Sequence, residues 1–182
     1  MKTFSRERTL VSRWALGLTW CLALASMPAA RAQDMTAEAL SARAQIQDLI
    51  TRYYYNFGRE KAENFTDFYA EDGELILGTT HFKGKDGIAK AYGGARRSGG
   101  GGPPPKRYSF NVTISNPLIV VHGDTATSQL IYTEYVMEKQ GDAPKVTTQG
   151  REYATFVKEH GKWRYKTRHI MGGNEPPEGW KD

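Results

Sequence analysis

The sequence predicts an α+β protein in which helices come first along the chain and a long antiparallel sheet follows. Three observations lead to this class. Apolar residues recur at helical spacing between residues 46 and 57, segments rich in Tyr, Thr, Val and Ile follow residue 107, and short turns join those segments. About 150 residues remain after a distinct N-terminal segment, which is enough for one domain with its own core.

The first 32 residues differ in composition from the rest of the chain. A basic start is followed by the apolar run Trp14 to Ala25 and by small residues up to Ala32. This order is typical of a cleaved secretory signal, and the run is too short to cross a hydrocarbon core of about 30 Å as a helix. We therefore expect an exported protein, periplasmic or secreted, whose domain covers 33–182 without a stable membrane anchor. An uncleaved anchor is the alternative.

The basic charge of the chain is concentrated in this leader. Of 25 basic and 20 acidic residues in total, the leader holds five and one, so that 20 and 19 remain. A domain this close to neutral lacks the basic patch that nucleic-acid binding requires, which excludes that class of partner. The single cysteine, Cys21, also lies in the leader. The mature domain therefore has no disulfide and no thiolate site.

Two helices open the domain in this prediction. The apolar residues between Ile46 and Phe57 lie on one helical stripe, with Thr36 as the N-cap and Gly58 as the end. A shorter helix is predicted around Phe65 to Tyr69. Three short elements come next, namely a strand, a second strand and a helix, over 74–77, 81–82 and 84–94.

The segment 93–105 is rich in Gly and Pro and has no apolar periodicity, which predicts a flexible loop. Two interpretations stay open: a disordered surface loop, or a mobile lid over the mouth of a pocket. After this loop the sequence predicts four strands joined by short turns, and therefore an antiparallel meander. The Asn116-Pro117 pair interrupts the first strand and predicts a bulge or bend. The four strands are expected over 108–121, 125–138, 145–158 and 162–171.

Several local strings, in this order and spacing, resemble the SnoaL-like families. They are 46–54 (IQDLITRYY), 68–73 (FYAEDG), 82–89 (FKGKDGIA), 115–126 (SNPLIVVHGDTA) and 150–168 (GREYATFVKEHGKWRYKTR), which together cover nearly all of a core at 37–171. The resemblance implies the cone-shaped fold of the nuclear transport factor 2-like (NTF2-like) superfamily, in which N-terminal helices pack on a curved, mostly antiparallel sheet around a pocket. It implies no single activity, because this fold hosts unrelated chemistries and members without any.

Two positions depart from the pattern of the enzymes in this group. Many of them have an aspartate shortly after the first-helix tyrosine, where this chain has Gly58 or Arg59. A histidine often precedes the "SN" of the third strand, where this chain has Asn111 and Val112. The resemblance therefore implies a pocket here without the usual carboxylate-based site.

Three residues are predicted to carry proton transfer: Tyr54, His169 and His81. Tyr54 lies on the apolar helix stripe, where its phenol can donate a proton or bind an oxyanion, and a simple buried aromatic is the alternative. Strand alternation places His169 on one face with Trp163 and Tyr165, so this histidine is expected to face inward. An imidazole with a pKa near 6.5 suits proton transfer, although a hydrogen-bonded core histidine is the alternative. His81 lies at a strand end, either at the pocket wall or on the surface.

A second set of residues is predicted to bind the substrate. Glu134 shares a strand face with apolar neighbours, and a carboxylate in such a place needs a partner or a function. Arg151 and Glu152 lie on opposite faces of one strand, so at most one of them enters the pocket. The histidine spacing does not fit a metal site, and no phosphate-binding loop is present, so we expect no metal and no cofactor. The full set is Asn111, Tyr108, Tyr132, Glu134, Tyr153 and Phe57.

The leading hypothesis for function is a cofactor-independent lyase or isomerase. It would dehydrate a small aromatic or polycyclic compound, or cleave it by a retro-aldol type elimination, with a tyrosine and a histidine moving protons; a lignin-derived phenol is one such compound. The alternative is a non-catalytic periplasmic module of the same fold that binds a small molecule or a partner. Apolar residues on both faces of the central strands predict a homodimer or another homo-oligomer.

Overall fold

The structure is a computed structural model that describes residues 35–57, 62–95, 107–173 and 175–180. The predicted signal segment, positions 58 and 59, and most of the Gly/Pro-rich segment lie outside these described residues. Within them, no helix is both long enough and apolar enough to cross a membrane.

The first predicted helix is confirmed as α1 (Ala37–Asn56). The hydroxyl of Thr36 caps it by accepting a hydrogen bond from the Ala39 backbone nitrogen at 3.2 Å, which satisfies one of the donors that a helix start leaves unpaired. Ile46, Ile50 and Tyr53 recur at helical spacing and are fully buried. This stripe is the face that α1 packs against the sheet.

The segment between the helices differs from the prediction. The expected second helix is a 3-10 helix, η1 (Ala62–Phe68), and the residues after it already belong to strand β1 (Tyr69–Leu77). The strand starts earlier than its local sequence indicates because Tyr69 is paired, in parallel, with Tyr165 of a strand far along the chain. Strand β2 (Thr80–Lys83) and helix α2 (Gly84–Ala95) follow as predicted.

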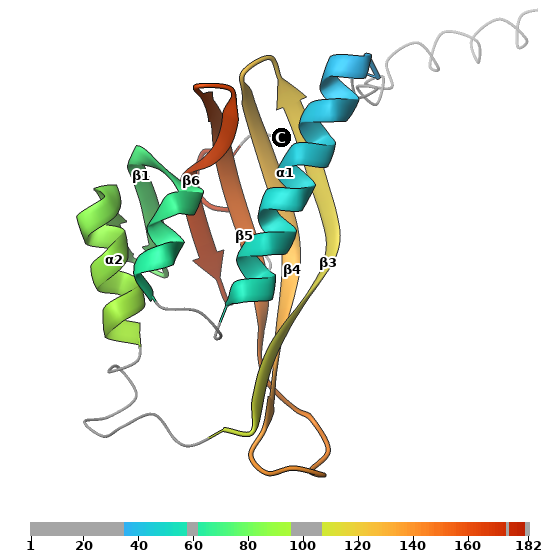
Figure 1. Ribbon diagram of the computed structural model, residues 1–182, viewed down its shortest axis with the longest axis vertical. Coiled ribbons are helices and arrows are strands. Elements are labelled where there is room, and N and C mark those ends of the chain that lie inside the picture. Colours follow the sequence, from blue (N-terminus) through green and yellow to red (C-terminus); the bar gives the residue numbers. More distant parts are fainter. Residues whose placement is uncertain (1–34, 58–61, 96–106, 174, 181–182) are drawn as a thin grey trace, which may run out of the picture. The chain divides into compact units, whose positions relative to one another are not determined.

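The meander is confirmed in the second half of the chain. Its strands are β3 (Ser109–His122), β4 (Thr125–Met137), β5 (Lys145–Glu159) and β6 (Lys162–Met171). The six-stranded sheet has the order β2-β1-β6-β5-β4-β3, and β1 joins β6 as the one parallel pair of this sheet (Figure 1). The predicted bulge is present, because the pairing with β4 shifts register between Ser115 and Leu118 and Asn116 has a φ of 51°.

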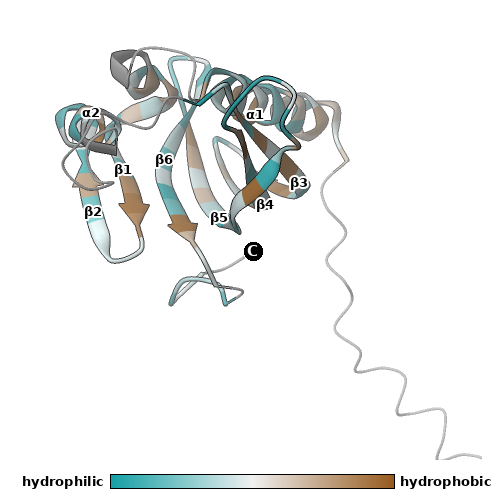
Figure 2. Cartoon of the chain, turned by 90° about the horizontal axis from the view of Figure 1, so that it is seen from below, coloured by the Kyte–Doolittle hydropathy of each residue, from teal (hydrophilic) through white to brown (hydrophobic). Residues whose placement is uncertain are grey.

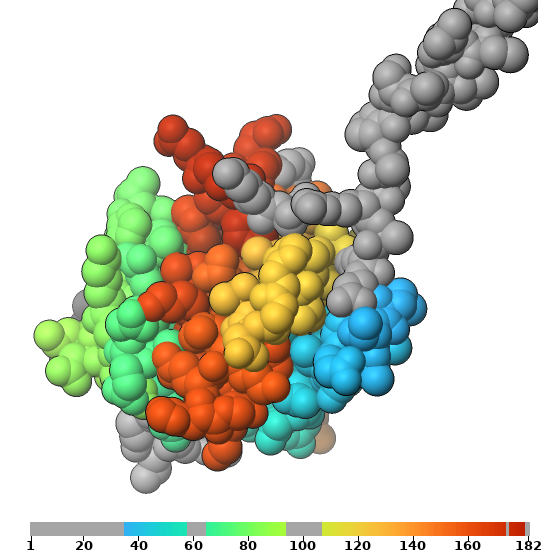
Figure 3. All heavy atoms as spheres, turned by 90° about the horizontal axis from the view of Figure 1, so that it is seen from above, coloured from blue at the N-terminus to red at the C-terminus, as the bar shows by residue number. Residues whose placement is uncertain are grey.

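Both helices lie on the same side of the sheet (Figure 2). Helix α1 packs mainly against β3, and α2 packs against η1 and β1. The core is built between this helical layer and the inner face of the sheet. Seen from the end at which β5 turns into β6, those two strands lie between the segment 62–95 on one side and α1 with β3 on the other (Figure 3).

A second bulge decides which face of β6 is inside. Tyr165 pairs with Phe156 and Thr167 pairs with the preceding residue of β5, so that Lys166 is an extra residue in β6. Such a bulge interrupts the strict alternation of a strand. As a result Tyr165 and Arg168, three positions apart, are both buried on the inner face.

Candidate functional site

A cavity of about 140 Å³ lies between the two helices and the inner face of the sheet. Most of its wall consists of aromatic and aliphatic side chains, among them Phe57, Leu75 and Ile170. A small number of polar groups among apolar walls is the usual composition of a ligand site. The polar groups come from Tyr53, Tyr54, Tyr92, Tyr132, Glu134 and Arg168.

Arg168 is the buried cation of this cavity. It is 4% exposed, and its partner Glu152, on the neighbouring strand β5, is 0% exposed. The guanidinium donates from Nε to Glu152 Oε2 at 2.9 Å, and Nη2 lies 2.7 Å from the same oxygen. A buried pair of opposite charges with two contacts compensates much of the free energy that each ion loses on leaving water.

Four tyrosine hydroxyls complete the surroundings of this pair, and we refer to Arg168, Glu152 and these tyrosines as the Arg168 cluster. Arg168 donates to the hydroxyls of Tyr53 at 2.5 Å and Tyr54 at 2.9 Å, and Tyr54 donates in turn to Glu152. The Tyr92 hydroxyl forms hydrogen bonds with the hydroxyls of Tyr53 and Tyr69, at oxygen–oxygen distances of 2.6 and 2.8 Å.

Burial raises the pKa of all four cluster tyrosines well above the ordinary phenol value, so they remain neutral. Burial lowers the pKa of Arg168, but Glu152 and the tyrosines raise it by more, so its net pKa is raised and the guanidinium keeps its charge. The cluster therefore places a buried ion pair, Arg168 with Glu152, and several neutral hydroxyls beside the cavity.

Glu134 and Tyr132 of β4 form the other polar part of the wall. Burial raises the pKa of the Glu134 carboxyl, against the opposing effects of Arg107 and of a hydrogen bond from Thr148. Burial and the nearby Glu134 raise the pKa of Tyr132. The Tyr132 hydroxyl makes no hydrogen bond with other described residues. A phenol that no other described residue pairs and a carboxyl of raised pKa thus face one cavity.

Gly150 makes room for Tyr132. A Cβ at this position would lie 2.6 Å from the Tyr132 hydroxyl oxygen and 2.3 Å from the backbone oxygen of Met171. Neither distance is compatible with a side chain, so glycine is required where Tyr132 crosses the neighbouring strand.

Four of the residues predicted from the sequence meet at this cavity, and the others lie elsewhere. Tyr54, Phe57, Tyr132 and Glu134 line it. Tyr108 is 54% exposed, and Asn111 is an exposed residue of β3. Tyr153 is buried, but its ring packs against Trp180, outside the cavity lining.

The two histidines are also away from the cavity lining. The expectation that His169 faces inward is wrong, because the bulge at Lys166 reverses the alternation after it. His169 pairs with Tyr153 on the outer face, and its Nε2 lies 3.2 Å from the backbone oxygen of Gly78. His81 is half-exposed on β2, where its Nδ1 lies 2.8 Å from Glu74 Oε1.

Arg168, Tyr53 and Tyr92 are cavity residues that the sequence pattern does not predict. Strict alternation along β6, which ignores the bulge at Lys166, places His169 on the inner face and Arg168 on the solvated face. The structure shows the reverse. The sequence does indicate that Glu152 faces inward, because it shares a strand face with the apolar residues Ala154 and Phe156. All three are buried in the structure. Among the described residues, no group of three or more histidine, cysteine or acidic side chains is placed to hold a metal ion.

The two helices on a curved, mostly antiparallel sheet, with a cavity between the layers, define an α+β protein of the NTF2-like class. The chain belongs to the SnoaL-like domain family, whose model matches residues 38–169. No curated protein matches the chain.

Solved structures with the same fold are similar to this chain at low sequence identity. An NTF2-like protein with a cystatin-like fold from Novosphingobium aromaticivorans is 24% identical, with a TM-score of 0.58 over 72% of this chain and 81% of the other. A putative scytalone dehydratase from the same organism is 18% identical, with a TM-score of 0.58 over 79% and 97%. ActVI-ORFA from Streptomyces coelicolor is 11% identical, with a TM-score of 0.62 over 72% and 96%. These similarities establish the fold.

Proposed function

We propose that this protein is an enzyme of the isomerase or dehydratase type that moves a proton on a small, single-ring organic molecule. The observation that carries the proposal is the cavity wall of β4. There the Glu134 carboxyl of raised pKa and the Tyr132 hydroxyl, which no other described residue pairs, face the space beside Arg168. The SnoaL-like family and a similar structure described as a putative scytalone dehydratase agree with this class of reaction.

Each polar group of the β4 wall has its own role in the proposed reaction. Glu134, once ionised, takes a proton from a carbon next to a carbonyl group of the substrate, and its raised pKa makes it a stronger base than an exposed carboxylate. Tyr132 donates a hydrogen bond to the oxygen on which negative charge develops. The guanidinium of Arg168, which is paired with Glu152, lies on the wall of the same cavity. Return of the proton to another carbon completes an isomerisation. In a dehydration, the bond from the neighbouring carbon to its hydroxyl breaks as the double bond forms, and the hydroxyl leaves as water with the proton that Glu134 holds.

The size of the cavity restricts the substrate. At about 140 Å³ it is close to the cavity of about 150 Å³ that holds benzene in an engineered protein, so it fits one ring and not a polycyclic compound. The aromatic walls suit a flat molecule, and a lignin-derived phenol with a short carbonyl side chain belongs to this class of compound. A retro-aldol type elimination from such a compound uses the same base and the same oxyanion contacts.

The test is hydrogen exchange in deuterated water. The full-length protein is incubated with a panel of single-ring ketones and phenolic carbonyl compounds, and loss of the acidic carbon-bound hydrogens is followed by proton NMR. We expect Glu134→Gln to lower the rate about 100-fold or more, and Tyr132→Phe to lower it about 100-fold, since each removes one catalytic interaction.

The matched control is Glu138→Gln, the same change at an exposed residue of the β4–β5 connection, and it should leave the rate unchanged. An equal loss in this variant would contradict the assignment of Glu134. Absence of exchange for every compound, together with compounds that raise the melting temperature, would replace the enzyme with a binding protein of the same fold.

Export and self-association are proposals that rest on the sequence. The order of charged, apolar and small residues in 1–32 supports export, and sequencing of the N-terminus of the protein after expression in a bacterium would locate the cleavage. Partly buried apolar residues on the outer face of β4, such as Ile131 and Tyr135, support a homodimer, which light scattering after gel filtration would measure.

A further inference from the structure

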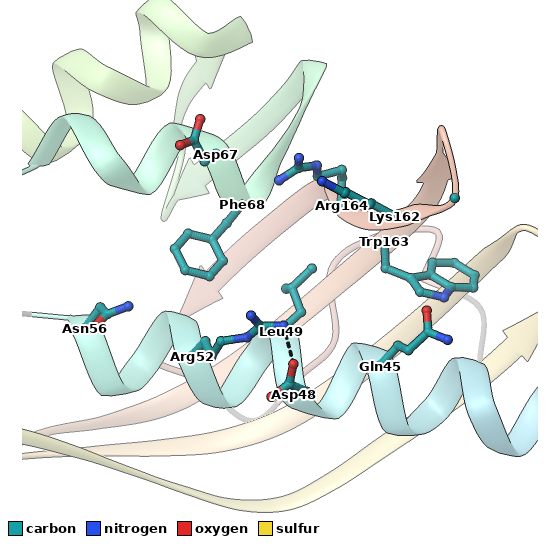
Figure 4. Close-up of a pocket in the computed structure, with 11 residues that line it drawn as sticks. Gln45, Asp48, Leu49, Arg52, Asn56, Asp67, Phe68, Lys162, Trp163 and Arg164 are labelled. Atoms are coloured by element: carbon teal, nitrogen blue, oxygen red, sulfur yellow. Dashed lines mark hydrogen bonds and ion pairs between the residues drawn. The ribbon is translucent and has the colours of Figure 1, made fainter.

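An open groove of about 590 Å³ lies outside the interior cavity, between α1, η1 and the start of β6 (Figure 4). Its volume is in the range of about 300–1,000 Å³ that small-molecule sites occupy. None of its lining residues is part of the Arg168 cluster or of the wall formed by Tyr132 and Glu134. The groove is therefore a separate place on the domain.

The apolar part of the groove ends at a buried indole. Leu49 of α1 and Phe68 of η1 line the groove, and Trp163 of β6 lines it further along (Figure 4). Trp163 is 5% exposed, yet its Nε1 has no hydrogen-bond partner among the described residues. Leaving a buried indole N–H unpaired costs free energy, so this group is suited to an acceptor supplied by a ligand.

The charged part of the groove has an excess of cations. Lys162 and Arg164 line it from β6, and neither forms an ion pair with another described residue. Arg52 is already paired with Asp48 one helical turn earlier. Asp67 is the one lining carboxylate without such a partner in the described part of the chain, so two unpaired cations face one unpaired anion.

We propose that this groove is a second ligand site, for a small aromatic carboxylate that carries another oxygen atom. The carboxylate binds between the ends of Lys162 and Arg164, which Figure 4 shows on the same side of the groove. The ring packs against Leu49 and Phe68, and the second oxygen accepts a hydrogen bond from Trp163 Nε1. Charge-assisted hydrogen bonds fix the acid, and the apolar wall selects a flat body.

The test uses 4-hydroxybenzoate as the probe and the indole N–H signals of the full-length, nitrogen-15-labelled protein as the readout. Trp163→Phe identifies the signal of Trp163, and the signal of Trp180 serves as an internal reference. We expect a saturable shift of the Trp163 signal. The double variant Lys162→Gln/Arg164→Gln should raise the dissociation constant about tenfold or more, since hydrogen bonds to charged groups are lost.

Three controls determine whether the probe binds in this groove and through these contacts. Lys139→Gln/Lys145→Gln removes the same charge at two exposed positions beside the β4–β5 connection and should leave the affinity unchanged. The neutral 4-hydroxybenzamide should bind more weakly through loss of the charge, and benzoate should bind more weakly through loss of the second oxygen. No saturable shift, or an affinity that is unchanged in Lys162→Gln/Arg164→Gln, would overturn the proposal. A loss of binding in Glu134→Gln would instead place the probe in the interior cavity, and this result would also overturn the proposal.

Discussion

Arg168 determines the electrostatics of the interior, because it brings a full charge into a layer of aromatic side chains. It contacts rings as well as hydroxyls, and the guanidinium carbon lies 4.0 Å from the centre of the Tyr53 ring. Cation–π contacts with the tyrosine rings, and the hydrogen bonds that Arg168 donates to tyrosine hydroxyls, replace the water that Arg168 loses on burial. The cluster is therefore a unit whose members depend on each other.

Changing Glu152 should destabilise the fold severely. Glu152→Gln leaves the charge of Arg168 buried without its counter-ion, and we expect a loss of about 3–5 kcal/mol in the free energy of unfolding, measured by urea denaturation. The double variant Glu152→Leu/Arg168→Met removes both charges and should be more stable than Glu152→Gln. Lys166→Gln, which breaks the exposed pair with Asp72, should leave the free energy of unfolding nearly unchanged. A double variant less stable than Glu152→Gln would contradict the charge argument.

The raised pKa of Glu134 predicts a dependence of stability on pH with a definite sign. The folded protein holds this proton to a higher pH than the unfolded chain does, because burial disfavours the carboxylate. The contribution of Glu134 is therefore complete below the unfolded pKa and is lost as the pH rises through the folded pKa. We expect the unfolding free energy of the native protein, relative to Glu134→Gln, to fall from about pH 4 upward and then level off. A relative stability that rises with pH would show that the pKa is lowered instead.

The residues of the cavity that could be predicted lie in elements with unbroken periodicity. Tyr54 and Phe57 follow the helical stripe of α1, and Tyr132 and Glu134 follow the alternation of β4. His169 lies three residues after the bulge at Lys166, where alternation from Trp163 leads to the wrong face. The pattern of β6 contains no proline or glycine that marks this bulge.

At the scale of the elements, the bulges decide which strands can be interpreted from their sequence. In β3, the Asn116-Pro117 pair both predicts and produces the shift in pairing. Strand β1 shows the opposite case, because its start at Tyr69 follows from pairing with β6 and not from local preference. Pairing between distant segments overrides local propensity, and a single sequence does not reveal such pairing.

Gly150 offers a test of packing between the elements. Gly150→Ala places a methyl group against the Tyr132 hydroxyl and against the backbone of β6, and overpacking of this kind costs about 1–3 kcal/mol. We expect a lower melting temperature and, under the proposed function, slower exchange through displacement of Tyr132. Gly93→Ala in α2 is the matched control, because its new methyl group meets no atom within 4 Å. It should be neutral or stabilise the helix, and equal effects in both variants would contradict the packing argument.

For the whole molecule, the fold class is predictable because it depends on the order of many elements and not on any one boundary. The meander of β3 to β6 and the first helix account for most of the core, and errors of a few residues in β1 do not change the class. The NTF2-like fold is confirmed by solved structures that share little sequence with this chain. The parallel join of β1 to β6 has no signal in the local sequence of either strand.

The position of β6 has a consequence for how the domain is made. Among the described strands it is the last in the sequence, yet it lies between β1 and β5. A chain that lacks β6 holds the strands only as two separate pieces, β2-β1 and β5-β4-β3. The same strand brings Arg168, so Glu152 has no counter-ion without it. Completion of the sheet and neutralisation of its interior therefore depend on the same strand, and a chain that ends before residue 162 has neither.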